Sequence, residues 1–339
     1  MNRGDALRLM QGLSGAPELV ETHSSLVILA EEIAYKIKKD VHFSFLDFST
    51  VELRRQDTVR ELELNRRLAP EVYLDVVNVC AEGELLRLGM PGEECANVVD
   101  HALRMKRLDR EMEMDKVLER GEVTGAFLEI LAAKVAAFHN GALVIREGSQ
   151  ATPEGYASDF NDILQEEEIF RQQLGNQAVE SLRAVVAVSD HFLETHSHHI
   201  AERLESGWVR DVHGDLHTRN IFAYADPVIF DCLEFNAHFR QIDVLNEVAF
   251  LCMDLESRGF AAFSQQFIDA YDRALHAFQT PEDRNLFVWF KCYRANVRAK
   301  VAAIRASQAT DIQSLKSEMA SYLELMAQYA AQLAAMPSE

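Results

Sequence analysis

The spacing of apolar residues changes part of the way along this chain of 339 residues, and the change limits the folds open to it. Apolar and polar residues alternate in several short early segments, which is the pattern of strands that bury one face. These segments lie at 26–38, 72–79, 85–88 and 102–108. Beyond them the apolar residues recur about every 3.6 positions, which predicts helices. The sequence therefore indicates an α+β protein with a small antiparallel sheet in residues 1–105 and a mainly helical part in residues 106–339, with the boundary near Met105.

One helix is predicted within the sheet part, and several are predicted after it. Ser49 or Thr50 can cap a helix that runs to Ala69, where Pro70 helps to end it. Residues 147–160 are the most loop-like stretch of the chain, because Gly, Ser, Thr and Pro gather there. The helices expected after this stretch span about 160–174, 177–205 and 244–336.

Composition narrows the classes of function. The formal net charge of −20 argues against non-specific nucleic-acid binding and is compatible with a cationic substrate. There is no run of about 18 apolar residues, and the first residues lack a signal-peptide pattern, so neither a membrane span nor export is predicted. The five cysteines form no CxxC pair and are odd in number, which favours a reduced, cytoplasmic setting. They are Cys80, Cys95, Cys232, Cys252 and Cys292.

Three oxygen-bearing side chains follow one another in the second half of the chain. Asp215 is followed five residues later by Asn220, and the apolar run Val228–Phe230 ends on Asp231. A short loop, a turn and then a strand tipped by a second aspartate would bring the three side chains close together. Phosphoryl transfer from ATP needs such a group, because one carboxylate accepts the proton of the attacking hydroxyl while an amide oxygen and a second carboxylate hold Mg²⁺.

This stretch is similar to a known family. Residues 213–220 (HGDLHTRN) resemble the HGDLHxxN loop of the aminoglycoside phosphotransferase (kinase-like) family, and residues 229–231 (IFD) resemble its counterpart of the kinase DFG segment. Residues 35–39 and 231–236 are similar to a bacterial branch of the family that is often fused to a C-terminal P-loop kinase-like domain. The resemblance implies a bilobal protein-kinase-like fold, ATP and Mg²⁺ as cofactors, and a kinase that phosphorylates a hydroxyl of a small molecule.

The resemblance assigns a role to each residue of the loop. It implies that Asp215 is the catalytic base and that Asn220 and Asp231 are the metal ligands. His213 and His217 would support the loop around the aspartate.

Other positions follow from the same resemblance. Asp243, in the run QIDV, resembles the family's aspartate that accepts hydrogen bonds from the backbone of the catalytic loop, which is a supporting role. The segment that contains Met105 and Arg107 occupies the position of the family's hinge, whose backbone meets adenine, so both are candidates for nucleotide binding. Glu234 and Asn236 fit either contacts beside the site or a plain surface turn.

Lys36 and Glu61 are expected to bind and brace the nucleotide phosphates. The run IAYK that ends at Lys36 resembles the kinase VAIK strand, whose lysine holds the α and β phosphates. Lys38 shares that strand face and is the fallback, and a solvated lysine pair on an edge strand is the plain alternative. The run RELELNRRL resembles the family's helix that carries the partner glutamate, and it indicates Glu61. Glu63 would point about 200° away around the helix, so both glutamates cannot serve, and an ordinary solvated helix face is the alternative.

The turn before the second strand departs from the family pattern. Residues 21–25 (ETHSS) contain no glycine where a phosphate-binding Gly-rich loop is expected, although hydroxyls and backbone amides can still bind phosphate. This absence favours a second interpretation of the function, in which the protein is a catalytically silent kinase-like module with a binding or regulatory role. A metallohydrolase is the third, because His213 and His217 have the spacing of zinc ligands, but Gly214 disfavours the helix that this spacing requires.

The phosphate acceptor stays open at this point. An aminoglycoside, another amino sugar, an amino alcohol, a nucleoside-like compound and a protein side chain all fit a hydroxyl-directed phosphotransferase. The chain contains no Walker A motif, so a separate P-loop protein is one candidate partner. Neither nucleic acid nor a membrane is expected as a partner.

Overall fold

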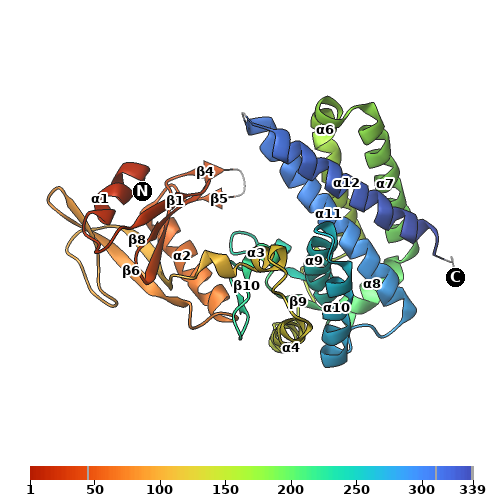
Figure 1. The fold of residues 1–339 in the computed structure, drawn as a ribbon, viewed down its shortest axis with the longest axis horizontal. Coiled ribbons are helices and arrows are strands. Elements are labelled where there is room, and N and C mark those ends of the chain that lie inside the picture. The colour runs from red at the N-terminus through yellow and green to blue at the C-terminus, as the bar shows by residue number, and fades with distance from the viewer. Residues whose placement is uncertain (44–45, 310, 337–339) are drawn as a thin grey trace. The chain divides into compact units, whose positions relative to one another are not determined.

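The computed structural model describes residues 1–43, 46–309 and 311–336, and the last residues of the predicted helical part, 337–339, lie outside this set. The chain divides into two compact units (Figure 1). The first, the sheet unit, contains Met1–Val117, Asn220–Tyr224 and Val228–Ala237, and the second, the helical unit, contains the rest. The predicted α+β class, with an antiparallel sheet and a mainly helical remainder, is confirmed.

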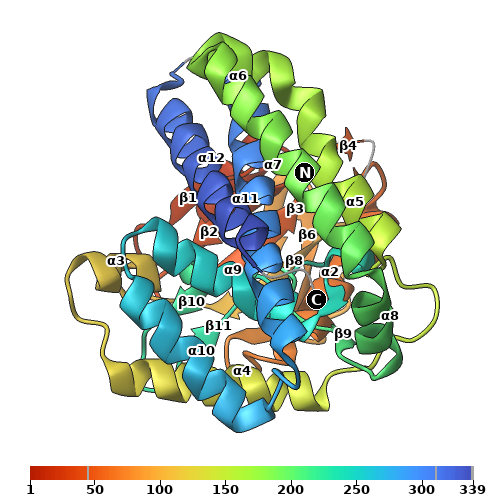
Figure 2. The same ribbon diagram turned by 90° about the vertical axis from the view of Figure 1, so that its right-hand side faces the viewer.

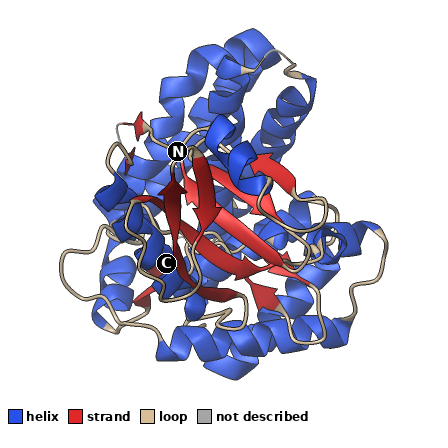
Figure 3. Cartoon of the chain, turned by 90° about the vertical axis from the view of Figure 1, so that its left-hand side faces the viewer, coloured by secondary structure: helices blue, strands red, loops and turns tan. Residues whose placement is uncertain are grey.

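The sheet unit is built on six antiparallel strands in the order β1-β2-β3-β8-β6-β7. Strands are drawn in red in Figure 3. Their bounds are β1 Glu18–Glu21, β2 Ser25–Leu29, β3 Ile33–Lys38, β6 Tyr73–Glu82, β7 Leu85–Leu88 and β8 Val98–Lys106, and a separate pair is β4 His42–Phe43 with β5 Leu46–Asp47. Leu26 and Ile37 point to the face where α1 (Arg3–Met10) contributes to a buried core. Because β3 lies between β2 and β8, its two lysines are not on an edge strand, and that alternative is wrong.

The helix α2 (Val51–Arg66) presents a polar face to the sheet. The Thr50 hydroxyl accepts a hydrogen bond from the Leu53 N–H, as expected for a predicted N-cap, and the helix ends shortly before Ala69. Its buried residues are all polar or charged: Arg54, Asp57, Thr58, Glu61 and Asn65. Buried polar groups are costly unless they are paired, so this face needs partners from the sheet and from later segments of the chain.

Two short strands bring the chain back to the sheet unit after the predicted catalytic loop. β10 (Ile221–Phe222) pairs antiparallel with β11 (Val228–Ile229). Phe222 packs in a core with Val72, Tyr73 and Leu103. The Ala223 N–H also donates to the Met112 carbonyl at 2.7 Å. Contacts of this kind explain why the division of the chain falls after Val117 and not near Met105.

The helical unit contains the helices from α4 onward (Figure 2). They are α4 Gly125–Gly141, α5 Pro153–Asn161, α6 Glu167–Leu174, α7 Asn176–Thr195, α8 Ser197–Glu205, α9 Val244–Ser257, α10 Ala261–Leu275, α11 Pro281–Gln308 and α12 Gln313–Ala334, while α3 Met114–Glu119 crosses from one unit into the other. Short 3-10 helices span Arg110–Met112, Asp162–Glu166, Thr218–Asn220 and Ala237–Phe239. Trp289 of α11 is fully buried and packs against Tyr156 and Phe160 of α5.

One strand pair of the helical unit positions the predicted catalytic loop. β9 (Val209–Asp211) pairs antiparallel with β12 (Gln241–Asp243). The loop follows β9 directly, and α9 follows β12 directly. The start of α9 is therefore available to support the loop.

Two expectations about the helices need correction. The stretch 147–160 is not a loop throughout, because α5 begins at Pro153, where the Thr152 hydroxyl accepts from the Gly155 N–H. A Thr-Pro start is a good helix beginning, so the loop-like composition concealed a capping signal. The single helix expected over 177–205 is divided into α7 and α8 at His196.

No helix in the described part of the chain has both the length and the apolar character needed to cross a membrane.

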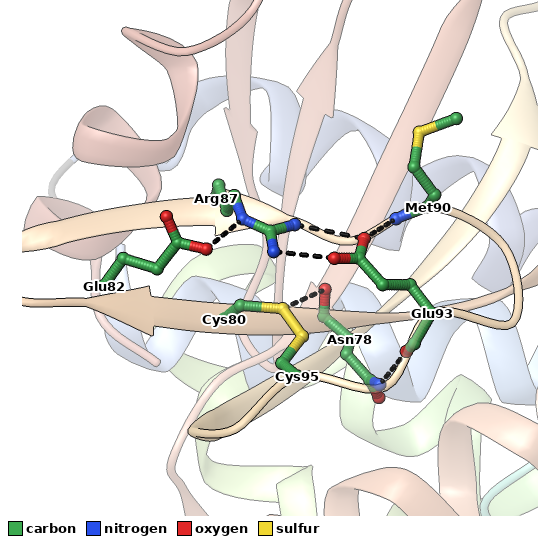
Figure 4. The surroundings of a disulfide bond; sticks show 7 residues. All are labelled: Asn78, Cys80, Glu82, Arg87, Met90, Glu93 and Cys95. Atoms are coloured by element: carbon green, nitrogen blue, oxygen red, sulfur yellow. Dashed lines mark hydrogen bonds and ion pairs between the residues drawn. A yellow bond between two sulfur atoms is a disulfide. The ribbon is translucent and has the colours of Figure 1, made fainter.

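The structure joins two of the cysteines. Cys80 of β6 forms a disulfide with Cys95, with their Cα atoms 5.9 Å apart (Figure 4). The chain after β7 turns back along β6, where the Asn78 side-chain amide donates to the Glu93 carbonyl at 2.8 Å. Arg87 of β7 also contacts Glu93 at 2.7 Å. The pairing arises from this return of the chain, which cysteine spacing does not reveal, and it differs from the reduced setting that was expected.

We expect the disulfide to be visible both in thiol counts and in stability. The oxidised protein should expose three thiols per chain in denaturant, from Cys232, Cys252 and Cys292, and five after reduction. Replacing Cys80 and Cys95 with alanine should lower the free energy of unfolding by about 3 kcal/mol, because the bond closes a loop of about 15 residues. Dithiothreitol should lower the urea midpoint of the wild type but not that of the variant, and five thiols before reduction would contradict the bond.

Candidate functional site

Lys36 of β3 contacts two carboxylates in the sheet unit. Its Nζ lies 2.6 Å from Glu61 Oε1 and 3.2 Å from Asp231 Oδ1. Burial alone would lower the pKa of Lys36, but the carboxylates of Asp231 and Glu61 hold it well above its ordinary value. The pKa of Glu61 falls to about 2, because the two nearby lysines outweigh its complete burial. The lysine therefore stays charged and is held at a fixed point of the strand.

The rotation of α2 selects Glu61 over Glu63. Glu61 is fully buried against the sheet, whereas Glu63 is exposed. Residues two positions apart in an α-helix differ by about 200° around its axis, so the side chains of Glu61 and Glu63 lie on opposite sides. The structure brings Lys36 and Glu61 together as an ion pair, and Glu63 takes no part in it.

Lys38 is also buried, which the sequence did not indicate. Its side chain is 2% exposed, and its Nζ lies 2.9 Å from Asp57, 2.6 Å from Glu61 and 2.9 Å from Glu234. The interpretation of Lys38 as a solvated lysine is therefore wrong. The alternative of a plain surface turn for Glu234 is also wrong, because this glutamate contacts a buried lysine.

Asp231 has a backbone conformation that is uncommon for residues other than glycine. Its φ is +62°, in the left-handed region that favours glycine, and such strain costs on the order of 1–3 kcal/mol. The Asp231 N–H donates to the Tyr73 hydroxyl at 3.0 Å, and the next N–H, of Cys232, donates to the Asn65 side-chain oxygen at 2.8 Å. The side chain of Asp231 is 46% exposed. The carboxylate is thus held in place and is open to a ligand.

Asn220 belongs to the same unit as Asp231. The Asn220 carbonyl accepts a hydrogen bond from the Phe230 N–H at 3.1 Å, next to the pairing of β10 with β11. Asn220 is buried. The backbone thus ties the predicted asparagine to the residue before the predicted aspartate.

A cavity of about 310 Å³ lies within the sheet unit. Its walls are mainly apolar and include Val27, Leu29, Ala34, Val72, Met105, Leu108, Phe222 and Phe230. Lys36 and Asp231 also line it, together with polar residues such as Thr22. Small-molecule sites commonly combine such apolar walls with a few charged groups, and the volume is at the lower end of their range.

The two hinge candidates differ in position. Met105 lines the cavity. Arg107 is not among the residues that line it. Its guanidinium donates to the Ala30 carbonyl at 2.8 Å and contacts Glu18 at 2.9 Å. The guanidinium therefore ties the end of β8 to the first strands of the sheet.

The glycine-free segment forms a tight turn. The Thr22 N–H donates to the Ser25 carbonyl at 2.9 Å, and the Ser25 N–H donates to the Thr22 hydroxyl at 3.0 Å. The Lys39 ammonium also donates to the Thr22 carbonyl at 3.0 Å. The Thr22 hydroxyl, a candidate phosphate donor, is thus already used within the turn.

Asp215 lies in the helical unit, between two histidines. Its Oδ2 is 3.4 Å from His217 Nε2, and its N–H donates to His213 Nδ1 at 3.3 Å. Burial raises the pKa of Asp215, but His217 and the positive charge of Arg298 oppose it, and the pKa lies below its ordinary value. The carboxylate is therefore ionised near neutral pH and can accept a proton or a hydrogen bond from a hydroxyl.

Glu247 of α9 supports the predicted catalytic loop through hydrogen bonds to its backbone. Its two oxygens accept hydrogen bonds from the N–H groups of His213 and Gly214, each at 2.9 Å. Gly214 has a φ of +87°, and a Cβ there would lie 2.8 Å from the Phe239 carbonyl, so glycine is required. Sequence reasoning missed Glu247, although a lone glutamate in the apolar run of α9 was a usable signal.

The prediction that Asp243 accepts hydrogen bonds from the backbone of the catalytic loop is wrong. Asp243 pairs with Arg203 at 2.7 and 2.9 Å and accepts from the Leu245 N–H, as the N-cap of α9. A cap carboxylate turns toward the first amides of its own helix, whereas Glu247, one turn further on, faces the loop. Asp254, two further turns along α9, accepts from the Thr218 N–H at 2.9 Å.

No model of a known protein family matches the sequence. Uncharacterized proteins of Mycobacterium tuberculosis and Mycobacterium bovis are 30% identical to it over 290 residues, which is 85% of this chain. The chain spans only about half (55%) of the length of these curated relatives.

Solved structures with the same fold include small-molecule kinases. A choline/ethanolamine kinase family protein from Mesorhizobium loti is 14% identical, with a TM-score of 0.52 over 97% of this chain and 98% of that chain. An aminoglycoside 2′-phosphotransferase bound to GDP is 13% identical, with a TM-score of 0.52 over 98% and 99% of the two chains. An amicoumacin kinase in complex with AMP-PNP, Ca²⁺ and amicoumacin is 13% identical, with a TM-score of 0.52 over 97% and 94%.

We expect Glu247 to make stability depend on pH. Its burial raises its pKa to about 7, from an ordinary value near 4.5, so the folded protein keeps a proton that the unfolded chain has lost. The stability due to this group is therefore complete below about pH 4.5 and is lost as the pH rises toward 7. Relative to Glu247→Gln, the wild type should lose on the order of 3 kcal/mol over that range. Urea unfolding of both proteins at several pH values is the measurement, and a constant difference would contradict the expectation.

Proposed function

We propose, from the premise that this chain has the kinase-like fold of aminoglycoside phosphotransferases and choline/ethanolamine kinases, that it transfers a phosphoryl group from ATP to a hydroxyl of a small molecule. One observation carries the proposal. An apolar cavity in the sheet unit is lined by Lys36 and Asp231, and this lysine is paired with a buried glutamate. A purine fits the apolar walls, and a lysine fits the phosphates.

The oxygen ligands suit Mg²⁺. Asp231 offers a carboxylate that is 46% exposed, and Asn220 offers an amide oxygen, which are ligands that this ion prefers. When bound, the ion would neutralise charge on the phosphates. In the nucleotide-bound protein, Asp231 would exchange its contact with Lys36 for the metal, and Lys36 would turn to the phosphates. The amicoumacin kinase complex with AMP-PNP and Ca²⁺ supports a nucleotide and a divalent ion for this fold.

Asp215 would act on the acceptor. Its pKa lies below the ordinary value, so it would hold the acceptor hydroxyl by a hydrogen bond and take its proton late, as the bond to phosphorus forms. His217 and the amide contacts of Glu247 would keep the carboxylate and its loop in one orientation. We propose an alcohol as the acceptor class.

A nucleotide-binding module without turnover is the second candidate. The tight turn at residues 22–25 favours it, because the Thr22 hydroxyl, a candidate phosphate donor, is already hydrogen-bonded to Ser25. The ionised Asp215 favours the enzyme, since a silent module does not require a carboxylate at that position. Incubating a metabolite extract with γ-labelled ATP and the protein separates the two. Label in a small molecule supports the enzyme, and binding of ATP without any labelled product supports the module.

We expect substitutions of Asp215 and of Asp231 to have different effects. Asp215→Asn should leave the affinity for ATP with Mg²⁺ nearly unchanged and lower phosphoryl transfer by about 10²–10⁴-fold. Asp231→Asn should lower both transfer and the part of the nucleotide affinity that depends on Mg²⁺, because a metal ligand loses its charge. Calorimetric titration of ATP with and without Mg²⁺, together with the labelling assay, measures both effects.

A matched control lies in the turn between β10 and β11. Asp226 is 77% exposed and pairs only with Lys134 among the described residues, at 2.9 Å, so Asp226→Asn should change neither binding nor transfer. Loss of metal-dependent binding in Asp215→Asn, with none in Asp231→Asn, would overturn the roles assigned here.

A further inference from the structure

We propose that Lys38 is a positioning residue, a built-in cation that holds Asp231 in its unusual conformation by way of Glu234. All the contacts on which this proposal depends lie within the sheet unit. Only its consequence for metal-dependent nucleotide binding rests on the proposed function.

The three carboxylates around Lys38 are spaced as ligands of a cation. Oxygens of Asp57, Glu61 and Glu234 lie within 4.8 Å of one another, close enough to share one metal ion. The Lys38 ammonium lies 2.6–2.9 Å from all three. It also lies 5.2 Å from the centre of the Phe48 ring, which closes another side. The ammonium therefore occupies the position that a metal ion would take.

A continuous chain of ion pairs joins the two lysines to the carboxylates of Asp231, Glu61 and Glu234. Asp231 contacts Lys36, and Lys36 contacts Glu61 through Oε1. Glu61 contacts Lys38 through its other oxygen, Oε2, and Lys38 contacts Glu234. The backbone from 231 to 234 closes the ring. A displacement of Lys38 would therefore reach Asp231 by two routes.

Asp231 needs support on both sides because of its positive φ. The hydrogen bonds to Tyr73 and Asn65 hold the N–H groups of residues 231 and 232, one on each side of the Asp231 Cα. The contact of Glu234 with Lys38 anchors the same segment two residues further along the chain. Without that contact, the strained residue could relax toward a more common conformation.

Lys38 also gives Lys36 freedom to change partners. In the structure Lys36 is shared between Glu61 and Asp231. If Lys36 turns to a phosphate and Asp231 to a metal, Glu61 is still neutralised by Lys38 through Oε2. The buried glutamate then keeps its position while the groups around it rearrange.

The direct test is hydrogen exchange of the free protein, because it needs no ligand. In Lys38→Met, the amides of Asp231 and Cys232 should exchange at least tenfold faster than in the wild type, because their segment is released. The amides that pair β10 with β11 should exchange at the unchanged rate and serve as an internal control. Unchanged exchange at 231 and 232 would overturn the proposal.

The second measurement is the gain in affinity for AMP-PNP on adding Mg²⁺. Lys38→Met should lower this gain at least tenfold, in addition to any loss of metal-free affinity that follows when Lys36 alone must neutralise Glu61. Among the described residues, the groups that the Lys38 ammonium contacts, which are Asp57, Glu61, Glu234 and the Phe48 ring, do not line the cavity. A lysine that only stabilised the fold would leave the gain intact, and that result would also overturn the proposal.

A control and a milder variant complete the test. Arg104 forms an ion pair with Asp75 across β8 and β6, at 2.6 Å, and neither residue lines the cavity, so Arg104→Met should leave the gain and the exchange rates unchanged. If Lys38→Met does not fold, Glu234→Ala removes the same contact from the other side and should give the same pattern of change. A wild type that binds no nucleotide would refute the proposed function alone, and hydrogen exchange would still decide whether Lys38 holds Asp231.

Discussion

The sheet unit depends on one buried carboxylate that two lysines share. Each oxygen of Glu61 lies 2.6 Å from an ammonium group, and the side chain is inaccessible to solvent. A buried carboxylate without partners would be strongly destabilising, so the two lysines of β3 and the glutamate of α2 require one another. The pairing fixes the rotation of α2 against the sheet and explains why the buried face of this helix is polar.

Both units use a buried glutamate on a helix to hold a functional segment, but they compensate its charge differently. Glu61 meets two ammonium groups, and its pKa falls to about 2. Glu247 receives two backbone N–H groups and lies near Arg294, and burial still raises its pKa to about 7. Full positive charges in contact offset desolvation, whereas amide dipoles offset only part of it. The charge of Glu61 is therefore insensitive to pH near neutrality, whereas the charge of Glu247 changes there.

Local patterns predicted local structure well, and the contacts between distant segments escaped them. Alternation and capping signals gave the strands and α2, and the resemblance to kinases gave the pairing of Lys36 with Glu61, because such signals lie within a few residues. The burial of Lys38 depends on Glu234, almost two hundred residues later in the chain, and no local pattern records that contact. The short motif around Asp243 indicated this residue as the support of the loop, and Glu247 was missed, because a motif match does not record the direction of a side chain. The partner of Cys80 depends on how the chain returns after β7, which spacing does not encode.

The turn at residues 22–25 has a consequence for the thermodynamics of any ligand that binds beside it. A glycine-rich loop is flexible before a ligand arrives and loses conformational entropy when it closes over phosphate. Here the hydrogen bonds between Thr22 and Ser25, and the contact of Lys39 with the Thr22 carbonyl, already order the turn. Little entropy remains to be lost, so this segment would contribute to affinity through the fit of a preformed surface and not through the ordering of a loop.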